Sequence, residues 1–180
     1  MPLDRLRSNC ENRKIPIISQ ATENFLKEFL EIHQPKTCLE IWGAVWYSSL
    51  FIASLINKWQ GKIYSFEISY PAYLEWLYNT SLVKNLILYP FDFININPKK
   101  LVYNHIDFIF IDWQKKQYID YIKNLENKIW PETIIVLDDV IKYHSKLSKL
   151  YEYLSKKQIF YKILQLEPDD GIMLIQNYKW

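Results

Sequence analysis

Residues 106–111 read IDFIFI, and Asp112 follows them directly. The run is apolar except for one aspartate and is rich in isoleucine and phenylalanine, which is typical of a central parallel strand covered on both faces. A second run of this kind, TIIVL at residues 133–137, is followed directly by Asp138 and Asp139. Two buried strands that both end in carboxylates indicate an α/β protein with acidic side chains at one edge of its sheet.

Shorter apolar runs on either side of these two strands alternate with helical patterns. The patterns predict further strands at 37–41, 62–66, 86–89, 159–166 and 172–176, and helices at 19–33, 47–58, 71–79, 116–128 and 143–156. This alternation favours a Rossmann-like, doubly wound and mostly parallel sheet. The last two strands flank a turn at 167–171 and form a hairpin, so one C-terminal strand is expected to be antiparallel. We expect residues 1–180 to form a single domain, with 1–14 as a poorly ordered N-terminal segment.

Composition narrows the class of protein and its partners. Hydrophobic residues make up 49% and charged residues 23% of the chain, which is a globular balance. The net charge is +2, and the lysines are scattered among acids, so nucleic acid is not an expected partner. No apolar run approaches the roughly 18 residues that cross a bilayer, and residues 1–14 do not resemble a signal peptide. Cys10 and Cys38 are too few for a disulfide framework, so a cytoplasmic location is expected.

A doubly wound sheet holds its ligand outside the carboxyl ends of its strands, so the residues directly after the strands are the candidates for a site. Glu67 ends the second predicted strand, about 25 residues after the first, where nucleoside-binding folds hold ribose hydroxyls. A solvated acid at a strand end is the alternative. Asp92 follows the third strand in the same way.

Asp112, Asp138 and Asp139 follow two strands whose ends should lie side by side, roughly 5 Å apart. Carboxylates that close repel one another unless they are protonated or bind a cation, and oxygen ligands alone favour an ion such as Mg²⁺. The alternative is that one or more of them caps a following helix. Lys115 comes three residues after Asp112, where a lysine could be tuned to act as a general base or could be solvated.

Six segments of the chain resemble, in order and in spacing, those of a known family. They are IPIISQ at 15–20, LEIWGAVWYS at 39–48, YSFEI at 64–68, DWQKKQY at 112–118, VLDDV at 136–140 and DGIMLI at 170–175. The family is that of the cation-dependent O-methyltransferases, class I S-adenosylmethionine-dependent enzymes that include the catechol and caffeoyl-CoA enzymes. The resemblance implies a seven-stranded sheet in the order 3-2-1-4-5-7-6 with strand 7 antiparallel.

The resemblance also implies the chemistry of the site. S-adenosylmethionine would be the methyl donor, a small hydroxylated molecule the acceptor, and Mg²⁺ or a similar cation would bind Asp112, Asp138 and Asp139. The catalytic residues would be Lys115 and Asp112, with Lys115 helping to deprotonate the acceptor before direct methyl transfer. Asp139 stands where the family has asparagine. The family is often dimeric, so a homodimer is a candidate assembly. The cofactor-binding residues that follow are Ile18, Glu40, Trp42, Gly43, Ala44, Ser48, Glu67, Asp92, Asp112 and Trp113.

Trp42 and Trp46 stand at the two glycine positions of the family's first motif. Glycine there lets the chain turn and approach the cofactor, and tryptophan adopts a positive φ only at a cost. One explanation is a catalytically silent methyltransferase-like binding protein that has lost the cofactor loop. The other is that the gene uses UGA for glycine, as some bacteria do, where another code reads tryptophan. The chain has 3 glycines and 7 tryptophans, whereas average glycine usage is about 7%, and Trp113 lies in a strand-end turn.

Overall fold

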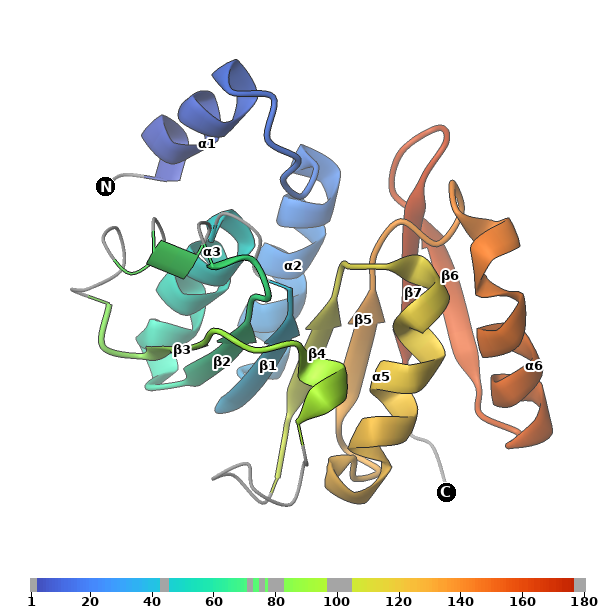
Figure 1. Cartoon of the computed structure of the whole chain (residues 1–180). Helices are drawn as coiled ribbons and strands as arrows, with labels where there is room; N and C mark the ends of the chain where they lie inside the picture. Colours follow the sequence, from blue (N-terminus) through green and yellow to red (C-terminus); the bar gives the residue numbers. More distant parts are fainter. Residues whose placement is uncertain are drawn as a thin grey trace.

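A computed structural model describes residues 3–42, 46–70, 73–74, 77, 83–96 and 105–176 of the chain. Its strands form a seven-stranded sheet in the order β3-β2-β1-β4-β5-β7-β6 (Figure 1). The strands are β1 (Thr37–Ile41), β2 (Lys62–Phe66), β3 (Leu86–Tyr89), β4 (Phe108–Ile111), β5 (Ile134–Leu137), β6 (Tyr161–Gln165) and β7 (Gly171–Ile175). Strands β1 to β5 pair in parallel, and β7 pairs antiparallel with both β5 and β6. The predicted fold class, strand order and hairpin are thus confirmed.

Helices cover both faces of this sheet (Figure 1). The α-helices are α1 (Leu3–Asn12), α2 (Gln20–His33), α3 (Tyr47–Ile56), α5 (Tyr118–Leu125) and α6 (Ser148–Lys156). Short 3-10 turns adjoin four of these helix ends: η1 (Asn57–Trp59) after α3, η4 (Lys115–Gln117) before α5, η5 (Glu126–Lys128) after α5 and η6 (His144–Leu147) before α6. A further turn, η2 (Phe93–Asn95), comes after β3. One apolar cluster joins α1, α2 and α3 to one face, and another joins α5 and α6 to the opposite face. The helix expected at 71–79 lies mostly outside the described residues.

Helix α2 begins and ends as its sequence predicts. The hydroxyl of Ser19 accepts a hydrogen bond from the backbone N–H of Thr22 at 3.1 Å, which satisfies a donor that the helix cannot satisfy itself. At the other end, Gln34 adopts a left-handed backbone conformation and Pro35 follows it. The helix therefore starts at the point where the segment 15–19 leaves the sheet edge, and it holds that segment in place.

The expectation of a poorly ordered N-terminal segment is corrected by α1. Leu3, Leu6 and Cys10 are spaced so that they share one face of a helix, and Leu6 and Cys10 are buried against the α3 side of the core. The remaining residues of the segment are mostly polar, so the sequence contains no continuous apolar run. The order of this segment comes from the partner surface that the fold supplies, because an isolated helix of ten residues is marginal in water.

Arg7 connects α1 to two other parts of the chain. Its Nε donates to the hydroxyl of Tyr47 at 3.1 Å, its Nη2 donates to the carbonyl oxygen of Ile18 at 3.3 Å, and its guanidinium pairs with Glu23. The Tyr47 hydroxyl in turn donates to Glu23 at 2.7 Å. Burial, together with this hydrogen bond, raises the pKa of Tyr47 to about 12, so the phenol stays a donor at neutral pH. The cluster fixes the 15–19 segment and the start of α3 relative to each other.

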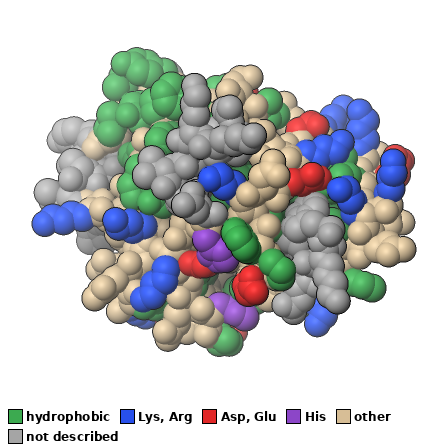
Figure 2. Space-filling model, turned by 90° about the horizontal axis from the view of Figure 1, so that it is seen from below, with side chains coloured by type: hydrophobic (Ala, Val, Ile, Leu, Met, Phe, Trp, Pro, Cys, Tyr) green, Lys and Arg blue, Asp and Glu red, His purple; other side chains and the backbone are tan. Residues whose placement is uncertain are grey.

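The charges on the surface are mixed. On the face shown in Figure 2, the described basic side chains are interspersed with acidic side chains and histidines and do not gather into one stripe. Within the described residues, no helix is both long and apolar enough to span a membrane.

Replacing Arg7 with methionine should destabilise the protein. Arg7→Met keeps most of the hydrocarbon stem but leaves the partly buried Glu23 carboxylate with one partner fewer, which should lower the free energy of unfolding by about 1–3 kcal/mol. Urea denaturation measures the change. Arg5→Met removes the same charge from an exposed position on the same helix and is the matched control. Equal stability of the two variants would contradict the role given to Arg7.

Candidate functional site

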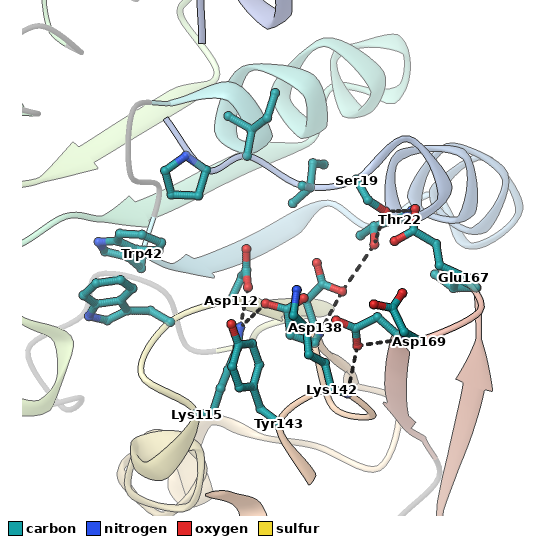
Figure 3. Close-up of a pocket in the computed structure, with 18 of the residues that line it drawn as sticks. Ser19, Thr22, Trp42, Asp112, Lys115, Asp138, Lys142, Tyr143, Glu167 and Asp169 are labelled. Atoms are coloured by element: carbon teal, nitrogen blue, oxygen red, sulfur yellow. Dashed lines mark hydrogen bonds and ion pairs between the residues drawn. The ribbon is translucent and has the colours of Figure 1, made fainter. Parts of the chain in front are cut away.

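A cavity of about 520 Å³ opens at the carboxyl ends of β1, β4 and β5 (Figure 3). The 15–19 segment forms one wall, and the turn between β6 and β7 forms another. The lining side chains divide into an acidic group, a basic and aromatic group, and an aromatic pair. They include Ile18, Thr22, Trp42, Asp112, Trp113, Lys115, Asp138, Asp139, Lys142, Tyr143, Lys146, Glu167, Asp169 and Asp170.

Lys115 lies between two of the predicted carboxylates. Its ammonium donates to Oδ1 of Asp112 at 2.6 Å and lies 2.9 Å from Oδ2 of Asp139. The turn η4 directly after β4 brings Lys115 back toward the strand end, and only 10% of its side chain is exposed. Burial by itself lowers the pKa of Lys115, but Asp112 and Asp139 together raise it above its usual value. The lysine is therefore held protonated by the two carboxylates.

Asp138 is the most deeply buried acid of the group, with 5% exposure. Its Oδ1 accepts from the hydroxyl of Thr22 at 3.3 Å and from the backbone N–H of Asp139 at 3.0 Å. Burial, and then the neighbouring carboxylates of Asp112 and Asp139, raise the pKa of Asp138 well above its ordinary value. The hydroxyl of Tyr118 donates to the carbonyl oxygen of Asp138 at 2.9 Å, which ties α5 to the end of β5.

Asp139 adopts a left-handed backbone with a φ of 56°. Aspartate and asparagine tolerate this conformation better than most residues, so the position accepts either of them. Burial opposes ionisation of Asp139, but the attraction of Lys115 outweighs it and lowers the pKa of this carboxyl. Asp170, at the turn before β7, is hydrogen-bonded with Asp139, and burial together with this contact raises the pKa of Asp170.

The oxygen ligands of this acidic group suit a hard cation, although its carboxylates are not already arranged around a metal position. Asp112, Asp138, Asp139 and Asp170 supply only oxygen ligands, and Lys115 is the ammonium that contacts two of them. Within the described residues, no three acidic, histidine or cysteine side chains already converge as metal ligands do. The Lys115 ammonium occupies the space between Asp112 and Asp139, and it would have to withdraw for a cation to bind both.

The predicted cofactor residues divide between the two sides of the site. Ile18, Trp42, Asp112 and Trp113 line the large cavity, and Asp92 borders a second, smaller cavity of about 40 Å³. Gly43 and Ala44 lie outside the described residues.

Three further predicted cofactor residues are buried around these cavities. Glu67 is buried at the end of β2 and accepts from the backbone N–H of Ser69 at 2.6 Å. Glu40 is fully buried and accepts from the hydroxyls of Ser49 and Ser65, so it links β1 to α3 and to β2. Ser48 is buried in the first turn of α3.

Both loop tryptophans adopt the backbone of a glycine. The φ of Trp42 is 79° and that of Trp46 is 76°, a conformation that costs a residue with a Cβ about 1–2 kcal/mol each. The Trp42 ring stacks on the ring of Trp113 with 3.6 Å between centroids. Trp46 is 2% exposed, and its buried indole nitrogen has no hydrogen-bond partner among the described residues, which costs about 1–3 kcal/mol more.

The structure adds lining residues that sequence patterns did not assign. Thr22 reads as an ordinary first-turn residue of a helix, and only the fold brings it to Asp138. Asp170 reads as a turn residue, and its contact with Asp139 depends on the position of β7 beside β5. Lys142 is the third such residue. It precedes the segment 143–146, whose place after the fifth predicted strand makes it a candidate for lining the acceptor site. Tyr143 and Lys146 of that segment do line the cavity, and the Lys146 ammonium lies 4.3 Å from the centre of the Tyr143 ring.

None of the three histidines lines either of these two cavities. His105 pairs with Asp107, while His33 and His144 pack against aromatic rings. They serve structural or surface contacts.

Asp112 should make stability depend on pH. Burial, only partly offset by Lys115, raises the pKa of Asp112 from 3.8 to about 6 in the folded protein. Between these values the folded chain binds more protons than the unfolded chain, so this carboxyl makes the protein less stable as the pH rises. Asp112→Asn should therefore gain stability relative to the parent between about pH 4 and about pH 7, by up to about 3 kcal/mol.

Urea denaturation in a chelating buffer at the two pH values measures this difference. Asp169→Asn changes an exposed acid at the rim of the same cavity and should show little pH-dependent gain. A gain for Asp112→Asn that is the same at both pH values would contradict the raised pKa.

Comparison with known proteins identifies the group to which this architecture belongs. The family model described as O-methyltransferase matches residues 3–178. A Staphylococcus aureus protein assigned provisionally as a caffeoyl-CoA O-methyltransferase superposes with a TM-score of 0.85 at 18% identity, over 98% of this chain and 92% of that one. An O-methyltransferase of tomaymycin synthesis from Streptomyces achromogenes, solved with S-adenosylmethionine, gives 0.84 at 16% identity, over 98% and 89%.

A third structure extends this comparison to an enzyme with bound SAH. The O-methyltransferase from Bacillus cereus gives a TM-score of 0.81 at 20% identity, over 97% of this chain and 90% of that one. Identities this low establish the shared fold, whereas the match to the family model spans nearly the whole chain. The chain therefore belongs to the O-methyltransferase family, the group that its strand-end motifs resemble.

Proposed function

We propose that this protein is an S-adenosylmethionine-dependent, metal-assisted O-methyltransferase that acts on a small hydroxylated acceptor. The observation that carries the proposal is the cluster of Lys115 with Asp112 and Asp139 at the carboxyl edge of the sheet. The Lys115 nitrogen, held between two carboxylates on the wall of a cavity of about 520 Å³, is placed to take a proton from a bound hydroxyl once the amine is neutral.

S-adenosylmethionine is proposed as the methyl donor because its nucleoside and its reactive methyl group match the two sides of the site. Asp92 and Glu67 lie at the ends of the strands on the β2–β3 side, where carboxylates are placed to accept from ribose hydroxyls. Asp112 and Ile18 lie on the side where the reacting group would be delivered. Family relatives solved with S-adenosylmethionine or SAH support this choice.

Asp112, Asp138 and Asp139 are proposed as the ligands of a divalent cation such as Mg²⁺. The three carboxylates offer hard oxygen donors, and burial and mutual repulsion make the ionised form of Asp138 costly unless positive charge is supplied. When bound, the cation would supply Lewis acidity that favours the ionised acceptor oxygen.

Lys115 is proposed as the base that takes the acceptor's proton on Nζ. While Asp112 and Asp139 both face Lys115, they keep it protonated and unable to accept. If a bound cation engages those carboxylates, they no longer raise the pKa of Lys115. Burial then lowers that pKa and favours the neutral amine. The centre of the Tyr118 ring lies 5.4 Å from Nζ of Lys115, and the ring limits where Nζ can move.

The acceptor is proposed to enter beside Tyr143. Tyr143, Lys142 and Lys146 line the cavity, and Tyr143 lies on the side opposite Ser19 (Figure 3). The cavity must hold both the acceptor and the methyl-bearing end of the donor, so the acceptor is expected to be small. A catalytically silent binding protein is not favoured, because the O-methyltransferase family model matches residues 3–178 and family relatives were solved with S-adenosylmethionine or SAH.

Cation binding should depend on the buried carboxylate. Calorimetric titration with Mg²⁺ should give binding to the parent chain and at least tenfold weaker binding to Asp138→Asn, because one charged ligand is lost. Asp169→Asn lowers the charge of the same cavity without touching the proposed ligands and should bind nearly as the parent does. Equal affinities for all three chains would remove the assignment of Asp138 as a ligand.

Methyl transfer should depend on Lys115. With S-adenosylmethionine, Mg²⁺ and a catechol as acceptor, Lys115→Met should lower kcat by about 10²- to 10⁴-fold, the usual contribution of a general base. Lys116→Met removes a neighbouring exposed lysine and should leave kcat close to that of the parent. Chelation of the cation should abolish turnover. Activity that persists in Lys115→Met would rule out this base.

A further inference from the structure

Positions 42 and 46 have a backbone conformation that favours glycine, although both carry tryptophan. The two residues flank the connection from β1 to α3, and both have φ values near +77°, at 79° and 76°. Glycine adopts this region freely, whereas a Cβ makes it unfavourable. The other described non-glycine residues with positive φ are the polar residues Lys14, Gln34, Gln60, Gln114, Asp139 and Gln158. Two indoles in the left-handed region, four positions apart, are the exception among them.

Among the residues that the structure describes, none makes a polar contact with the Trp46 side chain that would explain its presence at the start of α3. Trp46 occupies the N-cap position, yet no side-chain hydrogen bond between described residues caps the helix there. Its indole N–H is buried and has no acceptor among the described residues, although buried tryptophans usually find one. Trp59 provides the contrast, because its indole nitrogen donates to the carbonyl oxygen of Pro35 at 2.7 Å.

Trp42 divides the site into two parts. With Trp113, on which it stacks, it borders both the large cavity beside Asp112 and the small cavity beside Asp92. Figure 3 shows Trp42 beside Asp112 in the large cavity. A donor that joins a nucleoside to a reactive methyl group would have to pass between these cavities. The indole pair stands in that passage, and a glycine at position 42 would take one of the two rings away.

We infer that the chain made in its own cell carries glycine at positions 42 and 46, encoded by UGA in an organism that reads UGA as glycine. The left-handed backbone of both residues is independent of the proposed function, whereas the obstruction of the cleft by the indoles rests on it. Composition agrees with the inference, because the 180 residues include 3 glycines and 7 tryptophans. The site would then be one continuous cleft that binds S-adenosylmethionine from the Asp92 side to the Asp112 side.

The codons and the natural polypeptide test the identity of the two residues. UGA at both positions, and peptides from the source cell whose mass contains glycine at 42 and 46, are the expected results. UGG at either position overturns the inference, and so does a natural peptide that contains tryptophan. These readouts require neither folding nor activity of a recombinant protein.

Calorimetric titration with S-adenosylmethionine tests the consequence for the cleft. Trp42→Gly/Trp46→Gly should bind at least tenfold more tightly than the chain with both tryptophans. Trp130→Gly, at a half-exposed tryptophan that borders neither cavity, is the matched control and should bind as the parent does. Equal affinity with and without the two indoles overturns the inference that they obstruct the cleft. If UGA is confirmed and the glycine chain still does not bind, the proposed function fails while the identity of the residues stands.

Discussion

The parallel pairing of β4 with β1 on one side and with β5 on the other is the constraint on which the site depends. Ile41 pairs with Ile111, and Ile111 pairs with Leu137, so the three strands end at the same level. The next residues, Trp42, Asp112 and Asp138, therefore emerge side by side at one edge. Because these strands are buried on both faces, a shift of register would misalign their packing in both clusters and draw strand-end carboxylates toward the apolar core, so the core helps to fix the position of the carboxylates.

The cluster of charges at this edge is balanced between burial and attraction. Burial raises the pKa values of Asp112 and Asp138, while Lys115 pulls Asp112 and Asp139 toward the ionised form. A cluster in this state responds strongly to added positive charge, because a cation and the ammonium compete for the same oxygens. Such a balance is more characteristic of a functional site than of a stabilising ion pair, since buried pairs contribute little net stability.

The predicted fold was confirmed, and much of the site could be read as strand-end residues. The apolar runs identified the strands within one or two residues, because buried parallel strands leave a continuous apolar signal, and a residue that directly follows a strand is placed by that strand. The helix at residues 3–12 was not predicted, because its few apolar residues become a buried face only when they pack on the α3 side of the core. Thr22 and Asp170 escaped for the same reason, because they reach the site from a helix and a hairpin far away in sequence.

The sequence by itself determined the class of fold and the acids at the strand ends, because these follow from local pattern and spacing. Its resemblance to the family's first motif located the two positions where tryptophan stands in place of glycine. Only the tertiary structure decided which charges meet. It placed the Lys115 ammonium between Asp112 and Asp139, buried Asp138 against Thr22, and stacked Trp42 on Trp113 between two cavities. Distances across a sheet edge depend on register, turn conformation and the packing of helices from both faces, and no local pattern of residues contains that information.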